Sequence, residues 1–236
     1  MRLRRALTPL LPAAAYAALS VADSIAAGRR STSARRLRHV LKPALMPALT
    51  TAFLAGTREG PRPGTRVLHT GTAVGQAFSW GGDVALLGSG QRAFLTGVGS
   101  FFGAHVAYVG AFLSVRGAPA DHDTAGLKAA LAVWLTAGPV LSHAAGRKDP
   151  ALRVPVAAYA TILSGMFATS CMLDPALPAR ARRTMKAGTA LFVISDTVLA
   201  AQMFLRDEPS PFLESLVMTT YTAGQGLIAA GVAQAT

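Results

Sequence analysis

The chain has 236 residues, of which 51% are hydrophobic and only 14% are charged, and its formal net charge is +12 at pH 7. So small a charged fraction is low for the surface of a soluble domain. The single cysteine, Cys171, excludes an intramolecular disulfide and a cysteine metal cluster. The charged residues gather in short runs, and the nearly charge-free segments between them have about 17 to 23 residues, the length that spans ~30 Å of hydrocarbon. This pattern predicts a polytopic membrane protein.

Eight membrane spans are predicted along the chain. They cover roughly residues 8–26, 40–56, 67–88, 92–114, 126–145, 152–172, 185–204 and 212–234. The connections are too short to hold a soluble domain, so we expect residues 1–236 to form one integral membrane domain. The expected fold is all-α, a polytopic membrane helix bundle of eight transmembrane helices with short loops. A cleaved signal peptide is the alternative for the first span, but seven further spans favour an uncleaved helix.

The basic residues lie mainly between the predicted spans, in runs such as "GRRSTSARRLRH" and "PARARRTMK". At the ends of membrane helices such side chains bind lipid phosphates and set orientation, so we expect the bilayer as partner and no nucleic acid. The concentration of arginines within residues 29–38 favours that side as cytoplasmic. An Arg- and Ala-rich composition suggests a bacterium with GC-rich DNA. The expected location is therefore the bacterial inner membrane, as a multi-pass protein.

Four ionisable residues fall inside the predicted spans. They are Lys42 in the second span, Asp83 in the third, His105 in the fourth and Asp196 in the seventh. A charged side chain in mid-span costs ~2.5 to 3.5 kcal/mol even on insertion scales, which makes such residues functional candidates by default. Helix packing is one alternative, and a structural ion pair between Asp83 and Lys42 or an arginine is another. Because a carboxylate is an expensive way to hold helices together, we expect a functional site.

The depth of these polar residues in the membrane follows from the direction of each span, since an α-helix rises ~1.5 Å per residue. Counted in this way, most of them lie in the half of the bilayer that faces the Arg-rich first connection. The set is Lys42, Asp83, His105, Tyr159, Asp196, Tyr221 and Gln225. Overlapping depths on several helices predict a shared buried cavity that opens towards that side.

Helical spacing places some polar residues on a common face of their helix. The pairs are Ser79 with Asp83, His105 with Tyr108, and Tyr221 with Gln225. Hydrogen bonding between packed helices is the alternative reading for Ser79, Gln225 and the tyrosines.

Two carboxyl groups near one another in a low dielectric cannot both be ionised cheaply, so one of Asp83 and Asp196 should hold a proton near neutrality. A protonated acid beside a carboxylate can perform general acid catalysis through a cationic intermediate, and it can also relay protons in a transporter. No Gly-rich phosphate loop, Gly-x-Ser-x-Gly elbow or His-Glu-x-x-His motif is present. The "DHD" motif at 121–123 lacks the partner spacing of a metal site, so no metal is predicted.

Five motifs occur in order along the chain, from the second predicted span to the eighth. They are "KPALMPAL" with Lys42, "FSWGGDVALL" with Asp83, "GVGSFFGAHVAY" with His105 and Tyr108, "AGTALFVISDTVLAA" with Ser195 and Asp196, and "VMTTYTAGQGLI" with Tyr221 and Gln225. Together they resemble the YhhN, or lysoplasmalogenase-like, family of eight-span membrane proteins.

This resemblance implies hydrolysis of the vinyl ether bond of lysoplasmalogens without a cofactor. The products would be a fatty aldehyde and glycerophosphoethanolamine or glycerophosphocholine. Asp83 and Asp196 would be catalytic, one as proton donor and the other as the carboxylate that stabilises the cation and activates water. The residues expected to bind the lysophospholipid are Lys42, Ser79, His105, Tyr108, Tyr159, Ser195, Tyr221 and Gln225. The alternative is a proton-coupled transporter or a lipid-binding membrane protein that uses the same Asp pair as a relay.

Overall fold

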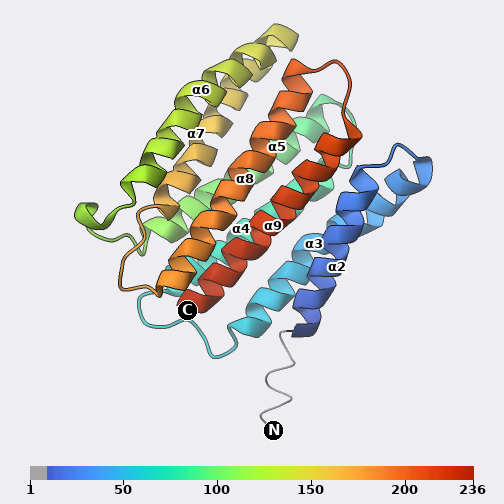
Figure 1. The fold of residues 1–236 in the computed structure, drawn as a ribbon. Coiled ribbons are helices and arrows are strands. Elements are labelled where there is room, and N and C mark those ends of the chain that lie inside the picture. The colour runs from blue at the N-terminus through green and yellow to red at the C-terminus, as the bar shows by residue number, and fades with distance from the viewer. Residues whose placement is uncertain (1–9) are drawn as a thin grey trace.

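In the computed structural model, which describes residues 10–236, the chain forms a bundle of long α-helices (Figure 1). The elements are α2 (Leu10–Ala27), α3 (Thr32–Gly56), α4 (Arg66–Ala85), α5 (Gly90–Leu113), η1 (Pro119–Asp121), α6 (Thr124–Lys148), η2 (Pro150–Leu152), α7 (Arg153–Ser170), α8 (Ala179–Leu205) and α9 (Pro211–Ala235). Within these described residues there is no β-strand, so the predicted all-α class is confirmed. Residues 8 and 9 of the first predicted span lie outside the described residues.

Two helices begin well before the spans predicted for them. Helix α3 begins at Thr32 instead of residue 40, and α8 begins at Ala179 instead of residue 185. Their additional turns are rich in arginine, which is a good helix former whose apolar stem can lie along the membrane surface. Ser31 caps α3, because its side chain accepts a hydrogen bond from the Ala34 N–H at 3.2 Å. The span prediction counted only apolar residues and therefore missed these turns.

Five helices are long and apolar enough to cross a membrane: α2, α5, α6, α7 with its preceding η2 turn, and α8. They indicate a multi-pass membrane protein. Large apolar side chains on the outside of the bundle agree with this, since Leu11, Val40, Val154 and Phe212 are each more than half exposed. The other three helices, α3, α4 and α9, carry many of the buried polar side chains described below. That all eight helices span the membrane stays a prediction.

Helices α8 and α9 cross at glycines. A Cβ atom built on Gly188 would lie 2.7 Å from the Gly224 carbonyl oxygen, and one on Gly224 would lie 2.8 Å from the Gly188 carbonyl oxygen. Only glycine allows this approach of two backbones. On its other side α9 is tied to α2, because the Tyr16 hydroxyl donates to the Thr222 carbonyl at 2.7 Å. Helix α9 thus lies between α8 and α2 (Figure 1).

Helix α3 is fixed against α4 next to Lys42. Pro47 has no N–H, so the carbonyl of Pro43 loses its partner within the helix. The Trp80 indole of α4 donates to that carbonyl at 3.0 Å and replaces the missing bond. One turn further on, the Thr50 hydroxyl donates to the Gln76 side chain at 2.8 Å. These bonds set the register in which Lys42 faces α4.

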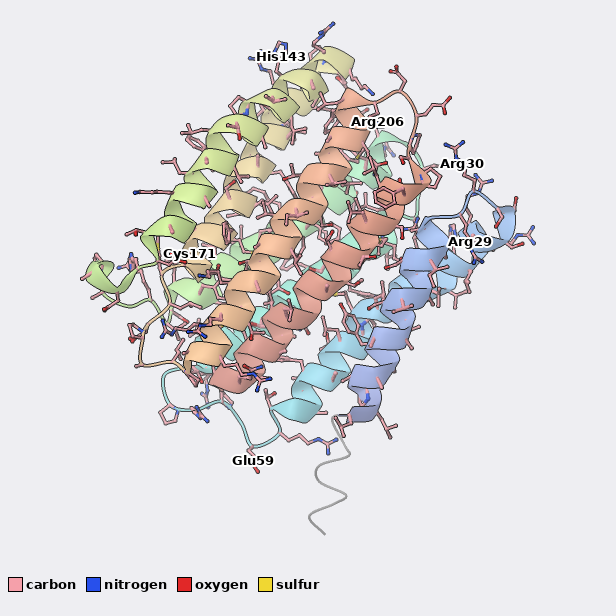
Figure 2. All side chains as sticks on the ribbon, viewed as in Figure 1. Arg29, Arg30, Glu59, His143, Cys171 and Arg206 are labelled. Atoms are coloured by element: carbon pink, nitrogen blue, oxygen red, sulfur yellow. The ribbon has the colours of Figure 1, made fainter. Side chains whose placement is uncertain are left out.

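The connections between the helices lie at two ends of the bundle, and we name the end that holds Arg29 and Arg30 the arginine end. The arginine end holds connections 28–31, 86–89, 149–152 and 206–210, and the far end holds connections 57–65, 114–123 and 171–178. Figure 2 shows Arg29, Arg30 and Arg206 at the arginine end and Glu59 at the far end.

Candidate active site

A cavity of about 430 Å³ lies in the half of the bundle that faces the arginine end. It is the side that the depths of the polar residues predict. Its lining residues are Arg38 and Lys42 of α3, Asp83 of α4, Leu86, Gly88, Gly90, Phe94, Val98 and Phe101, Val156 and Tyr159 of α7, Ser195, Asp196, Leu199, Ala200, Met203 and Phe204 of α8, and Glu214, Val217, Met218 and Tyr221 of α9. Asp83 and Asp196 therefore face one space.

Asp83 lies deep in the cavity wall beside a cation. The Lys42 Nζ atom is 3.5 Å from Asp83 Oδ1, and the Tyr221 hydroxyl donates to Asp83 Oδ2 at 2.7 Å. The two charged side chains are 11% and 1% exposed, respectively. The neighbouring Gly82 gives Phe101 room, since a Cβ atom there would lie 2.5 Å from the ring. The cation and the hydroxyl both favour the ionised form of Asp83.

Asp196 has a different environment. The Tyr159 hydroxyl donates to its Oδ2 at 2.5 Å, and its side chain is 12% exposed, towards the cavity. None of the ion pairs found in residues 10–236 joins Asp196 to a lysine or an arginine. Its nearest basic group is His105, whose Nε2 lies 4.0 Å from Oδ2. Asp196 is thus a buried carboxyl with a tyrosine but without a permanent cation.

The hydrogen bond on the other side of His105 decides which ring nitrogen carries the proton. Nδ1 lies 2.5 Å from the Phe101 carbonyl oxygen, which can only accept, so Nδ1 is the donor. In the neutral imidazole Nε2 is then a bare acceptor. This Nε2 is buried, has no hydrogen-bond partner among the described residues and lies 4.0 Å from Asp196 Oδ2, which is beyond hydrogen-bond distance.

Aromatic rings connect the two carboxyl groups behind the cavity. The centroid of the His105 ring lies 5.2 Å from that of Tyr159 and 4.8 Å from that of Phe192. The centroids of Phe192 and Tyr221 are 5.4 Å apart. All three contacts are edge to face, the geometry that aromatic pairs prefer. These rings pack together behind the cavity and form part of the wall between the two carboxyl groups.

The structure divides the predicted site residues into two groups. Those that line the cavity are Lys42, Asp83, Tyr159, Ser195, Asp196 and Tyr221. Those that do not are Ser79, His105, Tyr108 and Gln225, which are fully buried behind it. In this second group the Tyr108 hydroxyl donates to Gln225 Oε1 at 2.6 Å, and Gln225 Nε2 donates to Ser79 Oγ at 2.8 Å. These two hydrogen bonds join α5, α9 and α4 behind the cavity.

Three charged residues near the mouth of the cavity are not among the individually predicted site residues, although Arg38 belongs to the expected arginine cluster. Arg38 Nε lies 3.4 Å from Asp23 Oδ1, and Arg38 Nη1 lies 3.7 Å from Glu214 Oε2. The Asp23 side chain is fully buried. It falls near the end of the first predicted span, where a charge needs no special explanation. Opposite charges on both sides of a short connection were the signal that could have paired Asp23 with Arg38.

The "DHD" motif has a structural role at the far end. The Asp123 side chain caps α6 by accepting from the Gly126 N–H, and it accepts from Lys186 Nζ at 2.5 Å. In residues 10–236 no group of three or more His, Cys, Asp and Glu side chains could hold a metal ion.

Comparisons with known proteins agree on one family. The model of the YhhN family matches residues 37–232. A curated relative, lysoplasmalogenase TMEM86B of Homo sapiens, is 34% identical over 147 residues, which is 62% of this chain and 56% of the relative. The match thus spans little more than half the length of that relative. No solved structure matches the chain. With most of its length matched by the family model, the chain belongs to the YhhN family.

Proposed function

We propose that this chain is a lysoplasmalogenase, a hydrolase of the vinyl ether bond of single-chain ether phospholipids. One observation carries the proposal: two carboxyl groups face one cavity, and only Asp83 has a lysine beside it. This asymmetry supports Asp196 as the neutral acid and Asp83 as the carboxylate. Membership of the YhhN family and the similarity to a curated lysoplasmalogenase support the same chemistry.

The first chemical step is protonation of carbon. Asp196 gives its proton to carbon 2 of the alkenyl chain, and the π electrons of the vinyl ether form the new C–H bond. The resulting oxocarbenium ion shares its positive charge between carbon 1 and the ether oxygen. The Asp83 carboxylate faces the same space and stabilises this cation.

The second step is the addition of water, and the third is collapse of the hemiacetal. Water attacks carbon 1 while Asp83 takes one of its protons. The Asp196 carboxylate then removes the hemiacetal hydroxyl proton as Asp83 gives its proton to the leaving glycerol oxygen. The C–O bond to glycerol breaks, and an aldehyde forms. Both carboxyl groups return to their starting protonation states, so the cycle needs no cofactor.

The charged mouth of the cavity suits the phosphate of the substrate. Arg38 and Lys42 both line the cavity on its α3 side. Asp23 holds Arg38 at 3.4 Å, which orients the guanidinium towards this mouth. A phosphate bound here would place the glycerol and the vinyl ether deeper, beside the two carboxyl groups. The occupant we propose is a lysophospholipid drawn from the leaflet at the arginine end.

We also infer that all eight helices span the membrane and that this membrane is the inner membrane of a bacterium. Several polar side chains that lower the hydropathy of α3, α4 and α9 are buried inside the bundle, among them Lys42, Asp83 and Gln225. Their outer faces remain available to lipid. Reporter fusions at the connections between the helices test this topology, and reporters that alternate between the two sides are the expected result.

The proposed reaction is tested with purified protein and a lysoplasmalogen in D₂O. Fatty aldehyde should appear with one deuterium on carbon 2, since that carbon receives the catalytic proton. Asp83→Asn and Asp196→Asn should each lower the rate at least about 10²-fold, the contribution typical of a general acid or base. Asp207→Asn, which changes an exposed carboxylate outside the cavity, is the matched control.

Two results would contradict the proposal. Full activity in either Asp83→Asn or Asp196→Asn would rule out the paired mechanism. No aldehyde from the folded protein, together with proton-coupled lipid uptake into liposomes, would favour a transporter that uses the same residues.

A further inference from the structure

A second, smaller groove begins where the candidate active site ends. Its volume is about 40 Å³, and it lies between α6, α7 and α8. Its lining residues are Val133, Ala137, Gly138 and Leu141 of α6, Val156, Tyr159, Ala160, Leu163 and Ser164 of α7, and Asp196, Thr197 and Ala200 of α8. Four of them, Val156, Tyr159, Asp196 and Ala200, also line the large cavity. Asp196 therefore stands at the junction of the two spaces.

The groove continues away from the charged mouth. Along α7 the groove runs from Val156 to Ser164. Ser164 lies about eleven residues, or roughly 16 Å, from the start of this helix at the arginine end. That depth is about half of a ~30 Å hydrocarbon core. Beyond Asp196 no charged residue lines the groove. A lipid of the leaflet at the arginine end has the same polarity, with its phosphate at the surface and its tail towards the midplane.

We propose that this groove holds the alkenyl chain of the substrate, with the first carbons of the chain beside Asp196. The inference rests on the proposed function, since it places the reactive carbon where the polar cavity passes into the apolar groove. About 40 Å³ is room for the start of a chain, so the rest of the chain leaves between α6 and α8 to the lipid. Small residues at Ala137, Gly138 and Ala160 keep the groove open.

Filling the groove should change chain-length selectivity. Gly138 is a suitable position, because a Cβ atom there would meet Ala160 at an ordinary 3.8 Å. In Gly138→Leu we expect kcat/KM to fall at least about tenfold for every alkenyl chain that reaches past Asp196 into the groove, and to stay unchanged for a substrate whose alkenyl group has only two or three carbons and ends before it. Gly138→Ala should give a smaller change in the same direction, and it serves if Gly138→Leu does not fold.

The matched control is Gly165→Leu on α7. A Cβ atom at Gly165 has no heavy atom within 4 Å, and Gly165 does not line the groove, so chain-length selectivity should stay as in the unmodified protein. An equal loss at every chain length in the Gly138 variants, or no loss at all, would overturn the proposal.

Photo-cross-linking with a lipid analogue that cannot be hydrolysed tests whether the groove binds the chain, independently of catalysis. The probe is a saturated alkyl ether lysophosphoethanolamine with a diazirine in its chain, which cannot be hydrolysed as a vinyl ether. Cross-links should map to residues 133–141 and 156–164, and excess unlabelled lysolipid should remove them, while diacyl phospholipid vesicles should not. Labels confined to helices other than α6, α7 and α8, or equal competition by diacyl phospholipid, would overturn the proposal. Specific labels without aldehyde release would instead mean that the proposed reaction is wrong and the groove assignment holds.

Discussion

Two lysine–aspartate pairs lie at opposite ends of the molecule. Lys42 and Asp83 are 3.5 Å apart, with side chains 11% and 1% exposed, and Lys186 and Asp123 are 2.5 Å apart, with side chains 40% and 32% exposed. By distance alone the far-end pair would be the stronger. Water competes for the charged groups of the exposed far-end pair, however, whereas the pair at the cavity is largely desolvated. Burial, more than separation, decides what each pair contributes.

The far-end pair belongs to a structural clasp. The Asp123 N–H donates to the Cys171 carbonyl at 2.9 Å, and the Gly117 N–H donates to the Met172 carbonyl at 2.9 Å. These bonds tie the connection after α5 to the connection after α7. The Lys186 ammonium, followed by the Gly126 N–H, holds the pKa of the Asp123 carboxyl below its usual range. Here the charged pair joins the connection before α6 to helix α8, whereas at the cavity the charges face an open space.

Breaking the buried pair should have the largest effect on stability. Lys42→Met leaves the Asp83 charge uncompensated, so the free energy of unfolding should fall by about 3–5 kcal/mol. Adding Asp83→Asn should recover much of that loss, because the stranded charge is then removed. Denaturation of the purified variants in detergent measures both. If Lys42→Met and Lys186→Met cost the same, the contrast between the two pairs would be wrong.

Removing the tyrosine hydroxyl beside Asp83 should have an intermediate effect. Tyr221→Phe keeps the ring and loses one hydrogen bond to a charged group, which is worth about 1.5–3 kcal/mol. If that bond holds the carboxylate in place for the transition state, aldehyde release should slow about tenfold or more while the protein stays folded. An unchanged rate would show that the hydroxyl does not contribute to the reaction. The exposed-face change Thr219→Ala on the same helix is the control.

The exposed pair should give the smallest effect, with a characteristic pH dependence. The folded pKa of Asp123 lies below its unfolded value of ~3.9, so its stabilising contribution is full above that pH. The contribution is lost as the pH falls through the folded value. Lys186→Met should therefore cost about 1 kcal/mol or less at pH 7 and still less below pH ~3. Unfolding measured at both pH values checks this, and a larger cost in acid would contradict the sign.

Much of the fold could be predicted because apolar segments separated by charged runs leave few alternatives to a membrane helix bundle. Lys42, Asp83 and Asp196 could be found as candidates because each is costly where it stands. Helical spacing and depth grouped Tyr221 and Gln225, which share a face of α9. Gln225 lies one turn deeper, where it bonds with Tyr108 and Ser79, so only Tyr221 reaches the cavity. Asp23 was missed because its burial depends on Arg38 of the next helix.

The resting protonation states of Asp83 and Asp196 are tested most directly by infrared difference spectroscopy of the purified protein at neutral pH. A protonated carboxylic acid has a carbonyl band that a carboxylate lacks, and exchange into D₂O shifts it. With Asp196 neutral and Asp83 ionised, this band should disappear in Asp196→Asn and remain in Asp83→Asn. A band that disappears in Asp83→Asn and remains in Asp196→Asn would contradict the assignment of acid and carboxylate.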